Sequence, residues 1–234
     1  MSVAKPPTSR PLPESAPLLR VLEYASARMS RYGERHGIDW LVYNPVQMWT
    51  YHRLASADAA PLADAVIATF PRCRSIIDVG AGSGALAAEF KRRGERVWAY
   101  ERSRGGRVIS RMQGVPSKRF DLRRETPLRL SAPADVACCF EVAEHLPEHL
   151  GERLVDVLAS VAPVVIFSAA SPGQGGLGHV NERNPGYWIE RFGRAGARHD
   201  PAASMRIRET FAQAGGQAPW FQTNIHVFLA AGSR

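Results

Sequence analysis

A ten-residue segment of the chain joins a buried strand to a glycine-rich turn. Residues 75–84 read SIIDVGAGSG, so an apolar run leads directly into Gly80, Gly82 and Gly84. Glycine lets the backbone turn sharply and approach a bound molecule without Cβ clashes. The next apolar run, RVWAY, is followed by Glu101, whose carboxylate can accept hydrogen bonds from both hydroxyls of a ribose. The pattern predicts a strand, a turn and a helix that bind an adenosine-containing cofactor.

The acid that precedes the glycines discriminates between cofactors. Gly80, Gly82 and Ala85 also fit the loose G-x-G-x-x-G/A dinucleotide pattern, which alone decides little. Asp78 stands two residues before the first glycine, and Gly84 makes the turn G-x-G-x-G. A pyrophosphate disfavours a carboxylate so close by, whereas the sulfonium and amino groups of S-adenosylmethionine (SAM) tolerate one. The segment resembles motif I of the class I SAM-dependent methyltransferases.

The resemblance continues down the chain to about residue 230. Phe120-Asp121-Leu122 closes a weak third strand, and the resemblance implies that Asp121 lies near the adenine amino group. The string EVAEHLP at residues 141–147 is similar to the motif after the fourth strand of many small-molecule methyltransferases. The cofactor-binding residues that we predict from the motifs and the resemblance are Asp78, Gly80, Ala81, Gly82, Gly84, Glu101, Arg102, Asp121, Leu122, Phe140, Glu141 and Val142.

Strands and helices alternate through the same region. We expect strands at 74–79, 96–101, 117–121, 134–140, 162–169 and 224–230, with helices at 83–93, 104–112 and 148–160. Such alternation predicts an α/β fold with a parallel sheet that is covered on both faces. The resemblance implies a Rossmann-like sheet of seven strands, mostly parallel. Ligands bind at the carboxyl ends of such strands, where Asp78, Glu101, Asp121 and Glu141 all fall.

The chain before the first strand is expected to form a tail and a cap. Residues 1–17 are rich in proline and small polar residues and lack the apolar core of a signal peptide, so a disordered tail is predicted. Residues 18–70 contain an amphipathic helix at 18–36 and two further helices, around Val46–His52 and Leu62–Phe70. We expect them to form a helical cap on the SAM-binding domain, residues 71–234. Candidates for a lid, or for core packing, are Tyr43, Asn44, Trp49, Tyr51 and His52.

Two further segments bear on the chemistry. The first is Glu141–His149. The second, SAASPGQGGLGHVNERNPGYW at residues 168–188, is a glycine-rich loop after a strand, where a substrate loop belongs. The pair resembles bacterial methyltransferases with a GQGG-GHVNE-YW loop, which are often found among sugar and secondary-metabolite genes. His145 and His179 are the candidate catalytic residues, because a neutral imidazole can take the proton of an acceptor hydroxyl. A purely structural role for both histidines remains an alternative.

A metal site is another interpretation of the same histidines. Glu141, Glu144 and His145 lie at i, i+3 and i+4, so one helical turn can present them together, and His179 can join them from the next loop. This set resembles the metal site of small-RNA 3′-terminal 2′-O-methyltransferases and that of some quinone-pathway O-methyltransferases. Oxygen and imidazole ligands suit Mg²⁺, Mn²⁺ or Zn²⁺. The E-V-x-E-H-L string also occurs in metal-free relatives, where its first acid contacts SAM.

Charge and composition limit the partners. The net charge is +8, and 13 basic residues against four acids lie between Lys91 and Arg129. This is either a solvated surface or a face for acidic ligands such as nucleic acid. The sequence shows neither an RNA-binding module nor an apolar run of about 18 residues, the length of a membrane span. Three cysteines, two of them adjacent, predict reduced thiols and a cytoplasmic location.

The sequence therefore favours a SAM-dependent methyltransferase. We expect methylation of a hydroxyl, or less readily an amine, on a small polar metabolite such as a sugar or natural product, with no membrane involvement. The alternatives are a metal-assisted RNA 2′-O-methyltransferase and a SAM-binding partner subunit without catalysis. An NAD-linked oxidoreductase is disfavoured by the G-x-G-x-G turn and by the lack of a catalytic Tyr-x-x-x-Lys. The acceptor and the oligomeric state stay open.

Overall fold

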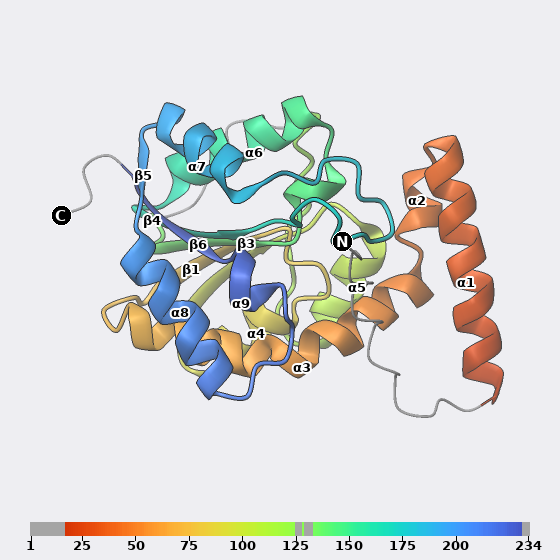
Figure 1. Cartoon of the computed structure of the whole chain (residues 1–234). Helices are drawn as coiled ribbons and strands as arrows, with labels where there is room; N and C mark the ends of the chain where they lie inside the picture. Colours follow the sequence, from red (N-terminus) through yellow and green to blue (C-terminus); the bar gives the residue numbers. More distant parts are fainter. Residues whose placement is uncertain (1–16, 125–127, 129–132, 231–234) are drawn as a thin grey trace, which may run out of the picture.

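A computed structural model of the chain describes residues 17–124, 128 and 133–230 (Figure 1). The predicted disordered tail lies outside the described residues, except for Pro17, which begins the first helix. Within the described part of the chain, the strands form one sheet that lies between two layers of helices, as predicted. No helix there combines the length and the apolar character that crossing a membrane requires.

The sheet has six strands in the order β2-β1-β3-β4-β6-β5. Their bounds are β1 Ser75–Val79, β2 Arg96–Tyr100, β3 Val136–Phe140, β4 Val164–Ser168, β5 Ala197–His199 and β6 His226–Ala230. The first four pair in parallel, and β6 runs antiparallel to both β4 and β5. The mostly parallel Rossmann-like sheet is thus confirmed, with six strands in the described residues where seven were predicted.

Two differences in the strands have local causes. The strand predicted at 117–121 is wrong, because this segment makes only an isolated parallel bridge between Lys118 and Tyr100. Lys118 donates its N–H to Ala99 and accepts from Glu101, after which the chain turns at Asp121. The short strand β5 was not predicted. It has three residues and pairs only with β6 at the sheet edge, so it carries little pattern of its own.

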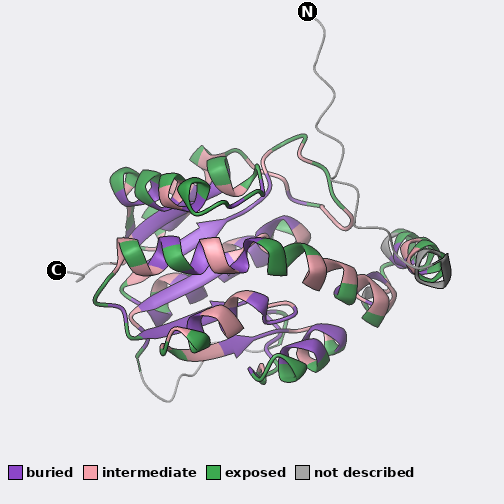
Figure 2. Ribbon diagram, turned by 90° about the horizontal axis from the view of Figure 1, so that it is seen from below, coloured by how far each residue is buried: buried purple, intermediate pink, exposed green. Residues whose placement is uncertain are grey.

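The two helix layers enclose the sheet and leave its strands buried (Figure 2). Helices α6 (Glu148–Val161) and α7 (Pro185–Arg194) cover one face, where Leu154, Leu158 and Phe192 enter the core. The other face is covered by α3 (Pro45–Thr69), α4 (Ala85–Arg92) and α8 (Pro201–Gln213). Helix α5 (Arg104–Met112) follows β2 and has the bounds predicted for it, and the short helix α9 (Phe221–Asn224) precedes β6.

Helix α3 corrects the prediction of two separate helices in residues 44–70. It runs through 25 residues with Pro61 inside it. The segment between the predicted helices, LASADAA, is rich in alanine, which favours helix strongly enough to carry the chain up to the proline. Beyond it, Leu62 and Val66 are anchored in the core against the sheet. The helix begins at the cap residue Asn44, whose side chain accepts from the N–H of Gln47.

Helices α1 (Pro17–His36) and α2 (Asp39–Val42) stand at one side of the molecule, near the start of α3 (Figure 1). The helix predicted at 18–36 is confirmed. Ser30 on α1 donates to the carbonyl of Val42, and Ser26 donates to Asn44, so α1 is tied to the α2–α3 junction. The division into a cap at 18–70 and a domain at 71–234 stays a prediction.

Candidate active site

The glycine turn after β1 is held against the ends of two neighbouring strands. The N–H groups of Gly80 and Ala81 donate to the carbonyl of Tyr100 at the end of β2, at 2.8 and 3.0 Å. Gly80 has a φ of 82°, and a Cβ at this position would collide with the side chain of Val142, which follows β3. A side chain at Gly82 would instead meet nothing closer than a backbone oxygen at 4.0 Å. The turn is therefore closed towards the sheet and has room at its tip.

Two predicted acids stand at this turn. Glu101 accepts hydrogen bonds from the N–H of Gly82 at 3.0 Å and from that of Ser103 at 2.5 Å, so its carboxylate is fixed beside the glycines. Burial raises the pKa of Glu101 although these bonds oppose the shift. Asp78 at the end of β1 is buried, and burial together with the charge of Glu101 raises its pKa to about 7. Both carboxyls thus favour a positively charged or hydrogen-donating neighbour.

Asp121 also lies on this side of the sheet but is engaged by its own neighbour. The guanidinium of Arg123 donates to both carboxylate oxygens, at 3.0 and 2.9 Å. These bonds hold the pKa of Asp121 at about 2. The predicted contact of Asp121 with adenine stays a prediction, and it requires Arg123 to share or release one oxygen.

The remaining predicted cofactor residues frame the same region. Ala81 packs against the small cluster of Ala87 and Ala99, and Leu122 is buried in the core. Phe140 ends β3 with its ring edge-on to Phe221 at 5.7 Å. Arg102 has its guanidinium 5.5 Å from the centre of the Tyr43 ring.

Glu141 occupies a strained turn directly after β3. Its φ of 53° makes it the only non-glycine residue of the described chain with a positive φ. Its carboxylate accepts from Ser168 at 2.7 Å and from Gln174 at 2.9 Å, and Asn224 donates to Gln174 in turn. Burial raises the pKa of Glu141 against these bonds. Sequence reasoning missed Ser168, Gln174 and Asn224: the first two lie in the predicted substrate loop without a motif of their own, and Asn224 comes from a segment 50 residues further along the chain.

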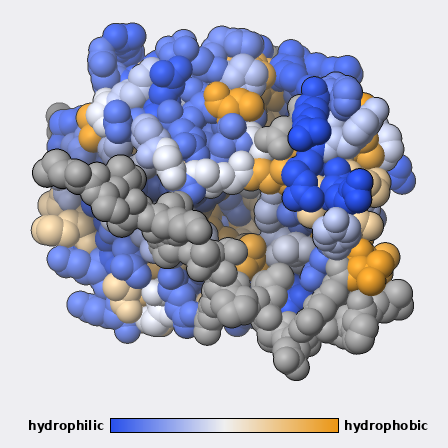
Figure 3. Space-filling model, turned by 45° about the vertical axis from the view of Figure 1, so that its right-hand side comes forward, coloured by the Kyte–Doolittle hydropathy of each residue, from blue (hydrophilic) through white to orange (hydrophobic). Residues whose placement is uncertain are grey.

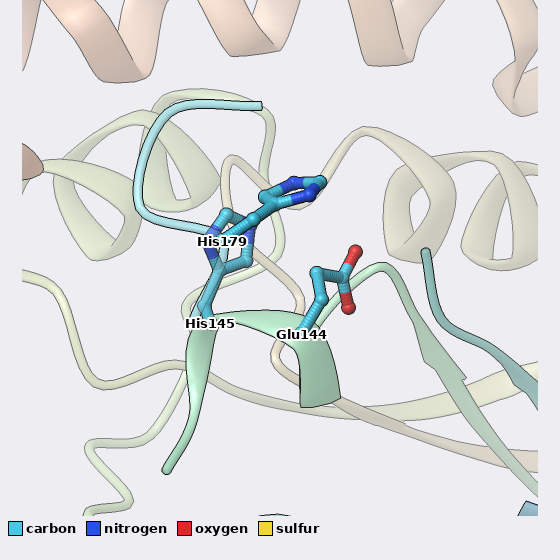
Figure 4. Close-up of side chains that lie close together, drawn as sticks. All are labelled: Glu144, His145 and His179. Atoms are coloured by element: carbon cyan, nitrogen blue, oxygen red, sulfur yellow. The ribbon is translucent and has the colours of Figure 1, made fainter. Parts of the chain in front are cut away.

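Three of the four predicted metal ligands meet in space. Glu144 and His145 lie on the 3₁₀ turn η1 (Ala143–His145), and His179 enters from the glycine-rich loop after β4 (Figure 4). One possible ligand atom from each residue lies within 4.8 Å of the others. Glu141 is outside this group, and its carboxylate is bound by Ser168 and Gln174.

The Glu144 carboxyl is buried without a partner. Glu144 is 0% exposed, and neither of its side-chain oxygens makes a hydrogen bond to another described residue. Burial, with the nearby charge of Glu141, raises the pKa of Glu144 well above its usual value. Because an unpaired buried carboxylate is costly, this group calls for a proton or a cation.

The two histidines are held by different groups. His145 Nδ1 lies 3.2 Å from the carbonyl oxygen of Gly178, and burial lowers its pKa to about 4, so its ring is neutral at pH 7. His179 Nδ1 lies 2.8 Å from a carboxylate oxygen of Glu182. The rings meet edge-on with centres 4.8 Å apart.

Glu182 is a site residue that sequence reasoning missed. Besides facing His179, its carboxylate accepts from the N–H groups of Gly173 and Gly175, at 2.8 and 2.7 Å. It therefore orders the glycine-rich loop and the imidazole together. Its spacing of three residues from His179 was the available signal.

The predicted lid residues divide between several roles. Tyr43 reaches the site, because its ring stands edge-on to His145 at 6.2 Å. Asn44 is buried as the cap of α3. His52 Nδ1 lies 3.0 Å from Ser83 Oγ in the glycine turn, while Trp49 is exposed beside His52. Tyr51 lies on α3 and is partly buried.

Comparisons with known proteins agree with this arrangement. Residues 50–194 match the family model described as a methyltransferase domain. A search of curated protein sequences gave no match. Solved structures give matches at low identity, which show the likeness of fold.

Three of these structures illustrate the identity, coverage and TM-score of the matches. An amino pentose methyltransferase of calicheamicin biosynthesis from Micromonospora echinaspora, solved with SAM, is 16% identical with a TM-score of 0.57, over 75% of this chain and 91% of that one. A TehB-like SAM-dependent methyltransferase from Corynebacterium glutamicum is 17% identical with a TM-score of 0.58, over 80% and 100%. The sugar N-methyltransferase KedS8 from Streptoalloteichus is 13% identical with a TM-score of 0.52, over 98% of each chain.

Proposed function

The chain belongs to the methyltransferase domain family, and from this membership we propose that it uses SAM to methylate a hydroxyl group of a small polar metabolite. The observation that carries the proposal is that the glycine turn, where the cofactor would bind, adjoins the cluster of ionisable side chains. Val142 packs against Gly80 of the turn whose Gly82 donates to Glu101, and two residues later Glu144 enters the cluster with His145 and His179.

The residues at the turn suit the proposed cofactor. SAM, when bound, supplies a methyl carbon that is already strongly electrophilic. Glu101 offers acceptor oxygens for the ribose hydroxyls beside a turn that has room for a ligand. Asp78, whose pKa is about 7 in the protein alone, would be held ionised by a nearby cationic group such as an ammonium or sulfonium. The chain thus positions the methyl donor, and alignment of donor and acceptor supplies most of the acceleration.

The cluster of Glu144, His145 and His179 is where we place the acceptor. A hydroxyl must lose a proton as it is methylated, whereas a neutral amine attacks through a free lone pair. A buried carboxyl and two imidazoles favour the first of these acceptors. Tyr43 adds an aromatic ring beside His145, and Arg102 places its guanidinium over that ring, which suits a polar ring compound such as a sugar. Two solved neighbours act on sugars according to their names, although one of them methylates nitrogen.

At least four of the 13 basic residues between Lys91 and Arg129 are bound by other groups of the fold, which leaves fewer of them for a nucleic acid. Arg92 and Arg93 pair with Glu89, and Arg93 also reaches Asp64. Arg107 donates to backbone carbonyls at the end of β2 and the start of α5, and Arg123 is bound to Asp121. These cations are used within the fold. The face in Figure 3 is mostly hydrophilic with small separate apolar patches.

Calorimetry with SAM and S-adenosylhomocysteine tests the cofactor, and a library of sugars, glycosides and phenols tests the acceptor through S-adenosylhomocysteine release. We expect micromolar binding of both nucleosides and turnover with a hydroxylated metabolite. Glu101→Gln should weaken the binding of both nucleosides by about 1–3 kcal/mol, while Glu95→Gln, on the loop before β2, should leave it unchanged. Absence of nucleoside binding would overturn the proposal. Methylation of RNA 3′ ends with none of the metabolites would replace it by the metal-assisted RNA alternative.

A further inference from the structure

We propose that Glu144, His145 and His179 form a binding site for one first-row divalent cation such as Zn²⁺ or Mn²⁺. Their ligand atoms converge within 4.8 Å from two segments of the chain, the turn η1 and the loop that carries His179 (Figure 4). The set contains two imidazole nitrogens and one carboxylate.

The unpaired state of Glu144 is the first argument. Both of its oxygens are buried without a hydrogen bond, the carboxyl of Glu141 is close by, and one ligand atom of Glu144 lies within 4.8 Å of a nitrogen of each imidazole. A native structure seldom keeps a buried polar group unsatisfied unless a water or an ion completes it. A divalent cation between Glu144 and the histidines would compensate the carboxylate and use the lone pairs of both rings.

The orientation of the two histidines is the second argument. His145 presents Nδ1 to the carbonyl oxygen of Gly178, and His179 presents Nδ1 to the carboxylate of Glu182. Each partner accepts a hydrogen bond, so each ring carries its proton on Nδ1 and leaves Nε2 as a lone-pair donor. Metal-binding histidines usually have this arrangement, in which a carbonyl or carboxylate fixes the tautomer.

The geometry also limits the kind of cation. Donors around a common ion at about 2.1 Å lie roughly 3 to 3.5 Å apart, so small side-chain rotations would close the present spacing. Two imidazoles and one carboxylate suit zinc, manganese or iron better than magnesium, which prefers oxygen ligands. Three protein ligands leave at least one position open, as in catalytic sites.

The role of the cation rests on the proposed function. An acceptor hydroxyl bound at the open position would be more acidic, as a metal-bound water is. Its O–H bond breaks with release of the proton to solvent, its oxygen forms a bond to the methyl carbon, and the carbon–sulfur bond breaks to leave a neutral thioether. In this arrangement His179 is a ligand, and Glu182 positions it.

Metal titration of the chelator-stripped full-length protein tests the site without any cofactor or acceptor. Zn²⁺ and Mn²⁺ are titrated by calorimetry, and Co²⁺ is followed through its visible absorption. We expect one equivalent to bind, with the affinity lowered at least tenfold by Glu144→Gln or His179→Ala. Glu182→Gln should lower it about 10- to 100-fold. His149→Ala is the matched control, because this histidine is exposed on α6 four residues from His145 and should leave binding unchanged.

The outcomes separate the site from the proposed function. Absence of stoichiometric binding, or binding that Glu144→Gln and His179→Ala leave intact, overturns the metal site. Thermal unfolding of each variant checks that it is folded, so that a loss of metal affinity can be assigned to the site. If SAM binds and methylation proceeds in the presence of chelator, the proposed methyltransferase function is supported and the proposed role of the cation is refuted. If the cation binds as expected and SAM does not, the site stands and the proposed function fails.

Discussion

The raised pKa of Asp78 makes cofactor affinity depend on pH in a calculable way. Burial and the charge of Glu101 bring this pKa to about 7 in the protein alone. If the bound cofactor places a cationic group near Asp78, binding requires the ionised carboxylate. The observed affinity then scales with the ionised fraction, which rises from about one-eleventh at pH 6 to about ten-elevenths at pH 8. We expect the dissociation constant of SAM to fall about tenfold over this interval, or about 1.4 kcal/mol.

The measurement is calorimetry of SAM binding at pH 6, 7 and 8, for the natural protein and for Asp78→Asn. The asparagine has nearly the same shape and does not titrate, so its profile contains only the titration of the ligand and of the other residues. The difference between the two profiles reports Asp78. A natural protein whose affinity is flat over this range, or whose profile matches that of Asp78→Asn, would refute the placement of Asp78 beside a cationic group.

The same substitution makes a separate prediction on stability. The folded-state pKa of Asp78 lies above the ordinary value of 3.8, so the cofactor-free protein loses stability as pH rises from about 4 through 7. The neutral Asp78→Asn variant does not undergo this loss. Urea unfolding should therefore show that the variant gains stability relative to the natural protein between pH 5 and pH 8. A constant difference in unfolding free energy would contradict the raised pKa.

Three further substitutions test the parts of the site separately. Gly82→Arg should abolish SAM binding, because the arginine fills the tip of the turn. Gly94→Arg, at another positive φ with open space around it, should leave SAM binding intact. An equal loss of binding in both variants would assign the effect to backbone strain. Glu101→Gln should weaken SAM binding by about 1–3 kcal/mol, since one or more bonds to a charged group are lost, and an unchanged dissociation constant would place the ribose elsewhere. His179→Ala should lower turnover about 10²-fold or more while the dissociation constant of SAM changes little, and full turnover would exclude a chemical role.

Sequence reasoning succeeded where a short segment determines its own structure. The turn after β1 was predicted from its glycines, and Gly80 has a φ of 82°, a conformation that glycine adopts readily. Helix α5 begins at the Ser103 cap, whose side chain accepts from Gly106, and its predicted bounds are confirmed. The apolar runs predicted the strands, so Asp78 and Glu101 could be placed at strand ends from the sequence.

The features that were missed depend on partners far along the chain. Helix α3 continues through Pro61 because the sheet and α8 fix its second half, which no local pattern reveals. The metal prediction included Glu141 because helical spacing placed it with Glu144. The chain instead enters Glu141 through a positive φ, and Ser168 and Gln174 bind its carboxylate.

The turn at Glu141 places the proposed cofactor-binding residues next to the cluster of Glu144, His145 and His179. Its backbone strain can be measured. A non-glycine residue at a φ of 53° costs about 1–2 kcal/mol, which the hydrogen bonds of Glu141 to Ser168 and Gln174 offset. Glu141→Ala keeps the backbone cost and loses those bonds, whereas Glu141→Gly loses the bonds and relieves the cost. We therefore expect the glycine variant to unfold with a free energy about 1 kcal/mol above that of the alanine variant, although glycine in an ordinary loop or strand is no more stable than alanine. Both variants should have reduced turnover, because η1 and its residue Glu144 follow directly from this turn. Equal stability of the two variants in urea would show that the backbone at Glu141 is not strained, and the turn would then have no special part in aligning the cofactor end with the acceptor end.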